Sequence, residues 1–402
     1  MTNKVKNVPE LRFPEFSGEW EENILGDVVI IKSGWSPSNF EKKDASVLLI
    51  KVDDLNYSSR MINNSKLKVN ENNKYKKIKK DSIIFPKRGA AILTNKVRIL
   101  GIDSYMDSNM MALEPKTINS EFLFTFIGKT GLYKIADTST IPQINNKHIE
   151  PYKILLPSST EQKYIGDFFS KLDRQIELEE QKLEKLEEQK KGYIQQIFSH
   201  QLIFKDKNGA IYPEWKTLKI KDIAEILRGL TYKPEDIRVA GIRVLRSSNI
   251  IKDKFHTYKD DIFVDESVVK IPLVNKGDIL ITAANGSPKL VGKHAIIEKL
   301  DDESVAGGFM YILRSDNSKF IQTWMSTVEY KRIISRVQGG NGSIGNLSRK
   351  DLENGYITLP CDEEQNKIGS FFNKFDELIE KQNKKIDGLK ERKKGFLQKM
   401  FV

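Results

Sequence analysis

The sequence predicts an α+β protein with an internal repeat: two globular domains, each followed by a long helix, related by a pseudo-twofold axis. Three observations predict this fold class in the 402-residue chain. Sequence segments return at a nearly constant spacing. Short apolar runs alternate with less regular segments, and a heptad pattern runs through the segments that repeat best.

The repeat is clearest in the two tails. Residues 165–173 read IGDFFSKLD and residues 368–376 read IGSFFNKFD, an offset of 203. The same offset relates residues 190–198, KKGYIQQIF, to residues 393–401, KKGFLQKMF, and an LP…EQ motif precedes both tails. Chance does not reproduce one offset three times. The expected parts are a first globular domain (1–157), a first long helix (158–200), a second globular domain (201–360) and a second long helix (361–402).

Matched apolar runs predict strands at corresponding places in the two globular domains. The pairs are 28–31 with 223–227, 50–54 with 245–249, and 82–85 with 279–281. A tryptophan, Trp20 or Trp215, precedes the first run of each domain, and a glycine turn follows it. Because these strands alternate with irregular segments, each domain is expected to be α+β.

Each tail predicts one long amphipathic helix. A strict 4,3 alternation from Ile165 gives eight apolar residues in ten positions, and the alternation from Ile368 has its polar interruptions at the same two places. About 37 residues correspond to roughly 55 Å of helix. The apolar residues expected to pair between the helices are Phe169, Leu172, Ile176, Leu183, Leu186, Phe372, Phe375, Ile379, Ile386 and Leu389.

The connection between the halves predicts how the helices run. Only residues 199–203 separate the first helix from the second domain, so that domain starts at the far end of the helix. Its own helix then returns toward the first domain, which makes the pair an antiparallel coiled coil that separates the two domains. The alternative is a single amphipathic helix packed on its own domain, but the shared interruptions favour pairing.

The charge balance favours a nucleic-acid partner. The chain has 66 basic and 55 acidic residues, a net charge of +11. The tails 161–200 and 364–402 carry −2 and +4, which leaves +9 in the globular domains. The domains are therefore the expected binders and the helices the spacer. A merely basic surface is the other interpretation of the total charge.

The sequence lacks the residues expected of a membrane protein, a secreted protein, a metal-binding protein or a cofactor-dependent enzyme. No apolar run approaches the length of a membrane span, the start of the chain lacks a secretory signal, and Cys361 is the only cysteine, so we expect a soluble, cytoplasmic protein. The four histidines lack metal-pair spacing. Methyltransferase and Walker motifs are absent, so we expect neither catalysis nor a cofactor.

Polar loops supply the candidate DNA-binding residues. Lysine, arginine and side-chain amides pair with phosphate, guanine and adenine. Polar loops are also common without any such role, and the basic run at residues 74–80 fits a solvated face. The candidates are Lys51, Lys87, Arg88, Gln143, Asn145, Asn146, Lys147, Arg246, Ser248, Asn249, Asn285, Lys289, Asn341, Asn346, Arg349 and Lys350.

Two variable domains, each closed by LP…EQ…IG, then FF.KLD or FF.KFD, then KKG…F, resemble the specificity subunit of type I restriction-modification enzymes. The resemblance covers almost the whole chain. It implies that each domain is a target-recognition domain for one half of a bipartite site in double-stranded DNA. It further implies that the helices dock two methyltransferase (M) subunits, which recruit restriction (R) subunits, and that the chain itself is non-catalytic.

The loops of the two domains differ, so the site is expected to be asymmetric. Two other functions stay open on the sequence alone. One is a stand-alone DNA-binding regulator without methyltransferase partners. The other is an enzyme that modifies or cuts DNA by itself.

Overall fold

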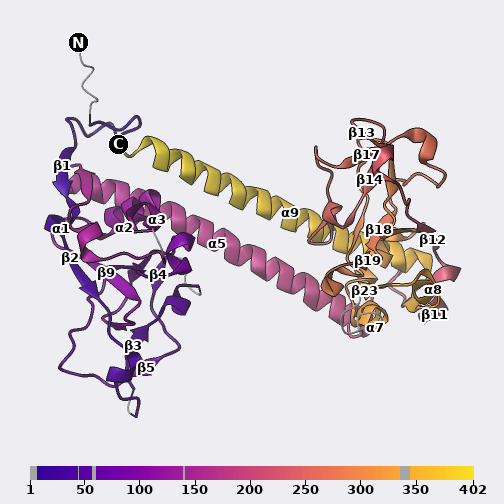
Figure 1. Cartoon of the computed structure of the whole chain (residues 1–402). Coiled ribbons are helices and arrows are strands. Elements are labelled where there is room, and N and C mark those ends of the chain that lie inside the picture. Colours follow the sequence, from indigo (N-terminus) through magenta and orange to yellow (C-terminus); the bar gives the residue numbers. More distant parts are fainter. Residues whose placement is uncertain (1–6, 44, 57–59, 139–140, 336–344) are drawn as a thin grey trace. The chain divides into compact units, whose positions relative to one another are not determined.

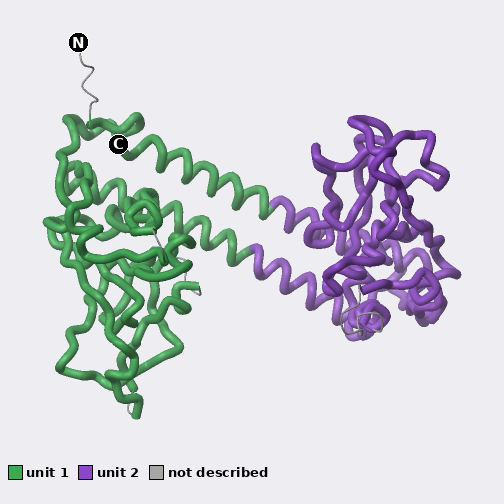
Figure 2. The backbone as a smooth tube through the Cα atoms, viewed as in Figure 1, with its two compact units in different colours: residues 1–182, 382–402 green, residues 183–381 purple. Residues whose placement is uncertain are grey.

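The computed structural model forms two compact units, residues 1–182 with 382–402 and residues 183–381 (Figure 2). Both long helices are continuous and contribute to both units. The structure describes residues 7–43, 45–56, 60–138, 141–335 and 345–402.

The first unit mixes strands and helices along its whole length (Figure 1). Its elements are β1 (Glu21–Ile24), α1 (Leu25–Val28), β2 (Val29–Ser33), η1 (Pro37–Asn39), β3 (Val47–Ile50), η2 (Val52–Asn56), β4 (Met61–Ile62), β5 (Lys68–Val69), β6 (Ile83–Pro86), η3 (Ala90–Thr94), β7 (Arg98–Leu100), β8 (Tyr105–Met106), β9 (Met110–Pro115), α2 (Ser120–Thr130), α3 (Leu132–Ile135), α4 (Asn146–Ile149), β10 (Lys153–Leu156) and the first part of α5 (Ser159–Phe198).

Among the described residues of this unit, the strands form sheets in the orders β2-β9-β6-β7-β4, β5-β3-β8 and β1-β10. Strands β3 and β6 are apolar and buried at every position, as strands covered on both faces should be. The main core joins Phe85 and Leu113 of the sheet to Phe122 of α2 and Phe169 of α5. Phe401, after α9, packs into the same core.

The second unit repeats this mixture. Its elements are β11 (Lys216–Lys219), η4 (Ile220–Asp222), β12 (Glu225–Arg228), η5 (Pro234–Asp236), β13 (Ile237–Arg238), β14 (Ile242–Leu245), η6 (Ser247–Asn249), β15 (Ile250–Ile251), β16 (Lys254–Phe255), β17 (Ile262–Val264), η7 (Glu266–Val268), β18 (Ile279–Thr282), β19 (Ala284–Asn285), η8 (Pro288–Leu290), β20 (His294–Ile296), β21 (Ser304–Ala306), β22 (Met310–Arg314), α6 (Ser318–Trp324), α7 (Val328–Ser335), β23 (Gly345–Asn346), α8 (Arg349–Glu353), β24 (Tyr356–Leu359) and the first part of α9 (Asp362–Lys399).

In the described part of this unit the larger sheets have the orders β12-β22-β18-β20 and β13-β17-β14-β21. Strand β18 is buried at every position, like its counterpart β6. Trp324 of α6 and Phe372 of α9 pack into the main core. The expected mixture of helices and strands is therefore confirmed in both units.

The repeated LP…EQ…IG motif has a packing explanation in both units. The Gln162 side chain donates to the carbonyl O of Pro157 (3.0 Å), and Gln365 donates to Pro360 (2.8 Å), which fixes the start of each long helix. A Cβ added to Gly166 would lie 2.7 Å from the Cβ of Glu121 at the start of α2. Glycine thus lets the short helix cross α5 at close range.

Within each unit, α5 and α9 run antiparallel. In the first unit, Lys393 Nζ lies 2.5 Å from Asp173, and Lys385 Nζ lies 2.5 Å from Glu179. Later residues of α9 therefore meet earlier residues of α5. In the second unit, Lys190 Nζ pairs with Asp376 at 2.6 Å in the same sense.

The apolar residues expected to pair between the two helices, which form the seam, are all buried or partly buried. Phe169, Ile176, Phe372, Ile379, Ile386 and Leu389 are buried, and Leu172, Leu183, Leu186 and Phe375 are partly buried. The polar interruption at Gln382 is also buried, because its Nε2 donates to the carbonyl O (2.8 Å) and Oε2 (2.6 Å) of Glu179. Glu179 and Gln382, the first polar interruption of each helix, are thus paired with each other, whereas the second interruptions, Lys190 and Lys393, pair with aspartates.

Candidate nucleic-acid interface

A tight turn at residues 107–109 organises the predicted loops of the first unit. The amide N of Lys87, just after β6, donates to the carbonyl O of Asn109 (2.8 Å). On the other side, the amide N of Asp107 donates to Ile50 (2.8 Å), the residue before Lys51. The turn therefore lies between two of the predicted DNA-binding lysines.

The loop before α4 joins this cluster. Gln143 forms a β-bridge with Arg88, and the amide N of Ile144 donates to the carbonyl O of Lys87 (2.9 Å). The Gln143 side chain donates from Nε2 to Asn145 Oδ1 (3.0 Å). The structure thus brings together the predicted residues of three separate loops.

Lys87 and Arg88 place two positive charges at adjacent positions of this cluster. Burial lowers the pKa of Lys87, the charge of Arg88 lowers it further, and Asp107 opposes this. Neither Lys87 nor Arg88 forms an ion pair with any residue that the structure describes. Two adjacent unpaired cations beside side-chain amides are suited to a phosphate or to base acceptors.

The second unit repeats the same backbone arrangement around its turn at residues 307–309. The amide N of Ala283, just after β18, donates to Phe309 (2.8 Å), and the amide N of Gly307 donates to Leu245 (2.8 Å), the residue before Arg246. Strand β19 pairs with β23, with Ala284 opposite Asn346. We call this shared set of backbone bonds the recognition frame.

The recognition frame shows which loop residues of the two units are equivalent, and the sequence alone did not align these residues. Ala283 and Ala284 occupy the places of Lys87 and Arg88, and Phe309 occupies the place of Asn109. Our sequence reasoning missed both turn residues. The available signal was their position directly before an apolar strand, β9 or β22, in both halves.

Most predicted residues are accessible. Exposed positions are Lys51, Arg88, Asn146, Lys147, Ser248, Lys289, Asn346 and Lys350; partly buried positions are Lys87, Gln143, Asn145, Arg246, Asn285 and Arg349. Asn341 lies outside the described residues.

The prediction for Asn249 is wrong. Its side chain is fully buried, and Nδ2 donates to Asp261 Oδ1 (2.9 Å) and to the carbonyl O of His256 (2.9 Å). Its Oδ1 accepts from the amide N of Arg246 (2.7 Å). With these bonds made, Asn249 shapes the loop that carries Arg246 instead of facing a ligand.

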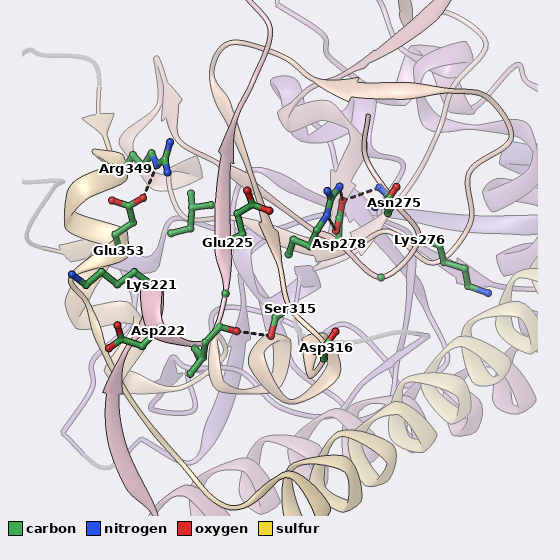
Figure 3. A pocket seen from close by; sticks show the side chains of 15 residues that line it. Lys221, Asp222, Glu225, Asn275, Lys276, Asp278, Ser315, Asp316, Arg349 and Glu353 are labelled. Carbon is green, nitrogen blue, oxygen red and sulfur yellow. Dashed lines mark hydrogen bonds and ion pairs between the residues drawn. The ribbon is translucent and has the colours of Figure 1, made fainter. Parts of the chain in front are cut away.

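Arg349 belongs to a different surface. Its Nε pairs with Glu353 Oε1 at 2.6 Å, and both residues line a hollow of about 640 Å³ in the second unit (Figure 3). Asp278 is also there, and Arg314 binds both of its carboxylate oxygens (2.9 and 2.8 Å). The charged residues that line the hollow are nearly balanced, five acidic and four basic: Asp222, Glu225, Asp278, Asp316, Glu353, Lys221, Lys276, Arg314 and Arg349. Among the described residues, Arg349 thus has a carboxylate partner within its own surface, unlike Lys87 and Arg88.

Comparison with models of known protein families shows that one family model matches both halves of the chain. The model of the type I restriction modification DNA specificity domain matches residues 17–188 and again residues 212–391. The chain belongs to the type I restriction-modification specificity subunits. The two matches fall on the two halves that carry the recognition frame, so each half holds one specificity domain.

One similar specificity subunit matches almost the whole chain, and another matches part of it. The chain is 25% identical to the type I restriction enzyme MjaVIII specificity subunit of Methanocaldococcus jannaschii, covering 99% of this chain and 95% of that protein. It is 28% identical to the EcoKI specificity subunit of Escherichia coli K12 over 42% of this chain and 37% of that protein. The fold resembles the crystal structure of a type I S subunit from M. genitalium, with a TM-score of 0.64, 15% identity and coverage of 98% and 99%.

In the described part of the chain, no helix is both long enough and apolar enough to span a membrane. Among the same residues, histidine, cysteine and carboxylate side chains form no group of three or more that could hold a metal ion.

Proposed function

We propose that this specificity subunit recognises a bipartite, asymmetric site in double-stranded DNA. The first globular domain (1–157) contacts one half-site and the second (201–360) contacts the other. The observation that carries this proposal is the recognition frame, which has the same backbone bonds but different side chains in the two units. Because the backbone presents different side chains in the same way in the two units, each unit is expected to contact a different half-site.

The proposed DNA-contacting set is the predicted one without Asn249 and Arg349. The cluster of Lys51, Lys87 and Arg88 supplies phosphate and base contacts to the first half-site. Arg246, Asn285 and neighbouring loop residues do so in the second. The recognition frame holds these loops beside one turn in each unit.

The long helices (158–200 and 361–402) are proposed to form an antiparallel coiled coil that separates the domains about a pseudo-twofold axis. Two reciprocal ion pairs support this arrangement. Lys190 with Asp376 and Lys393 with Asp173 join residues that occupy equivalent places in the repeat. Glu179 and Gln382 are equivalent to each other and meet directly, as expected for a pair beside such an axis.

The chemistry is proposed to reside in the partners. Two methyltransferase (M) subunits dock on the chain, restriction (R) subunits join through the complex, and this chain supplies recognition without catalysis. To test this, the chain is combined with its M subunits, and the methylated DNA motif is determined by sequencing. We expect a bipartite, asymmetric motif. A palindromic motif, or tight selective binding by this chain alone with no methylation in the complex, would contradict the proposal.

A further inference from the structure

The turn residue at the centre of the recognition frame differs sharply between the two units. It is Asn109 in the first and Phe309 in the second, and the Phe309 residue is 70% exposed. An exposed aromatic residue by itself indicates no function, because folded surfaces carry many apolar atoms. Phe309 is a candidate for a specific contact because it occupies the turn of the recognition frame.

The backbone holds this residue firmly while its side chain stays free. The carbonyl O of Phe309 accepts from the amide N of Ala283 (2.8 Å) and of Ala284 (3.1 Å). The amide N of Met310 donates to Gly307 (2.8 Å), which closes the turn. Any contact made by the side chain therefore requires little further ordering of the backbone, a property that favours specific binding.

The first unit holds Asn109 in the same way. Its carbonyl O accepts from Lys87, and its amide N donates to Asp107 Oδ1 (2.7 Å). Met110 closes the turn by donating to the carbonyl O of Asp107 (2.9 Å). The Asn109 side chain is exposed and lies between the loops of Lys87 and Lys51.

The neighbours of the turn change together with the turn residue. In the first unit the cations Lys87 and Arg88 stand beside Asn109, whereas Ala283 and Ala284 stand beside Phe309. The second unit therefore has no charge at these two positions, and its turn residue has a large apolar side chain. The contact made by the turn residue itself is expected to be apolar in the second unit.

We infer that this turn position contacts a base in each half-site, Asn109 through its amide to adenine and Phe309 through apolar contact with the methyl group of thymine. These are the pairings that side-chain geometry favours in the major groove. The inference rests on the proposed function, and it assigns a specificity-determining residue to each domain.

Base analogues test the Phe309 contact in the complex of this chain with its M subunits. Replacing thymine by uracil removes only the methyl group, so each thymine of the second half-site is replaced in turn. For the wild-type complex, one replacement should weaken binding about fourfold, the equivalent of one buried methyl group. Phe309→Ala should be insensitive to that replacement, and Phe309→Leu, which keeps an apolar side chain, should retain part of the sensitivity.

For Asn109, adenine is replaced by 7-deazaadenine, which lacks the N7 acceptor. One replacement in the first half-site should weaken wild-type binding by about tenfold or more, and Asn109→Ala should abolish that difference. Each variant should keep the normal response to analogues in the other half-site. This serves as the internal control for folding and assembly.

The outcomes separate the two proposals. If the wild-type complex binds a bipartite site but neither analogue series depends on residue 109 or 309, this inference fails and the proposed function stands. If the wild-type complex selects no bipartite site, the proposed function fails, and the inference fails with it.

Discussion

Gly166 allows a close approach between α2 and α5, so its replacement by alanine should destabilise the chain. A Cβ at this position would lie 2.7 Å from Glu121 Cβ and 2.9 Å from the amide N of Phe122. Both contacts are too short, and one involves backbone, so α2 must move. Such overpacking costs about 1–3 kcal/mol, and the better helix propensity of alanine returns about 0.5–1 kcal/mol. We expect a net loss of about 1–2 kcal/mol.

Gly192 provides the matched control because it lies in the same helix with nothing within 4 Å of an added Cβ. Gly192→Ala should therefore stabilise the chain by about 0.5–1 kcal/mol. The assay is urea unfolding of the full chain, with hydrogen exchange at α2 to locate the effect. If Gly166→Ala proved as stabilising as Gly192→Ala, the explanation of the repeated IG motif by close helix packing would be wrong.

Three further changes test the interface and the seam. Lys87→Ala with Arg88→Ala should weaken DNA binding by more than about 1 kcal/mol and flatten its salt dependence; unchanged affinity and slope would place that loop away from DNA. Gln382→Glu should destabilise the chain near neutral pH, because it opposes a carboxylate to Glu179, whose pKa is lowered by hydrogen bonds from Gln382 and Lys385. The deficit should shrink as the pH falls through the ordinary carboxyl range and a protonated oxygen can donate again; a deficit that does not change with pH in urea titrations would contradict this. The fragment 1–200 should form a dimer in sedimentation that tightens at acidic pH, since Glu179 would then meet its own copy, and a monomer at micromolar concentration would refute the proposed helix pairing.

Long-range periodicity made the helices predictable from the sequence. The observed helices, Ser159–Phe198 and Asp362–Lys399, match the predicted tails because the heptad pattern extends over many turns. Short buried strands such as Ile83–Pro86 were also predictable, since a continuous apolar run bounded by polar residues leaves few other structures. Each signal lies within one continuous stretch of sequence and does not depend on the tertiary fold.

The recognition frame was not predictable in the same way. The offset between the halves changes from about 195 near the start to 203 in the tails, so the loops could not be aligned by eye. The burial of Asn249 depends on Asp261 and His256, whose positions the tertiary fold decides. By contrast, the pairing of Arg349 with Glu353 is visible in the sequence as an i,i+4 spacing on one helix.

The polar residues of the long helices specify one register for their pairing. An apolar seam alone tolerates a slip of one heptad, because leucine and isoleucine recur at every step. Such a slip would separate Lys190 from Asp376, Lys393 from Asp173 and Gln382 from Glu179 all at once. The buried Gln382 would then lack the partner for its amide, and a buried unpaired polar group is costly. In the proposed arrangement, the register of the helices sets the distance between the two recognition frames. On this proposal, the residues that interrupt the apolar pattern fix the register of the helices, and with it the spacing at which the chain would contact two half-sites.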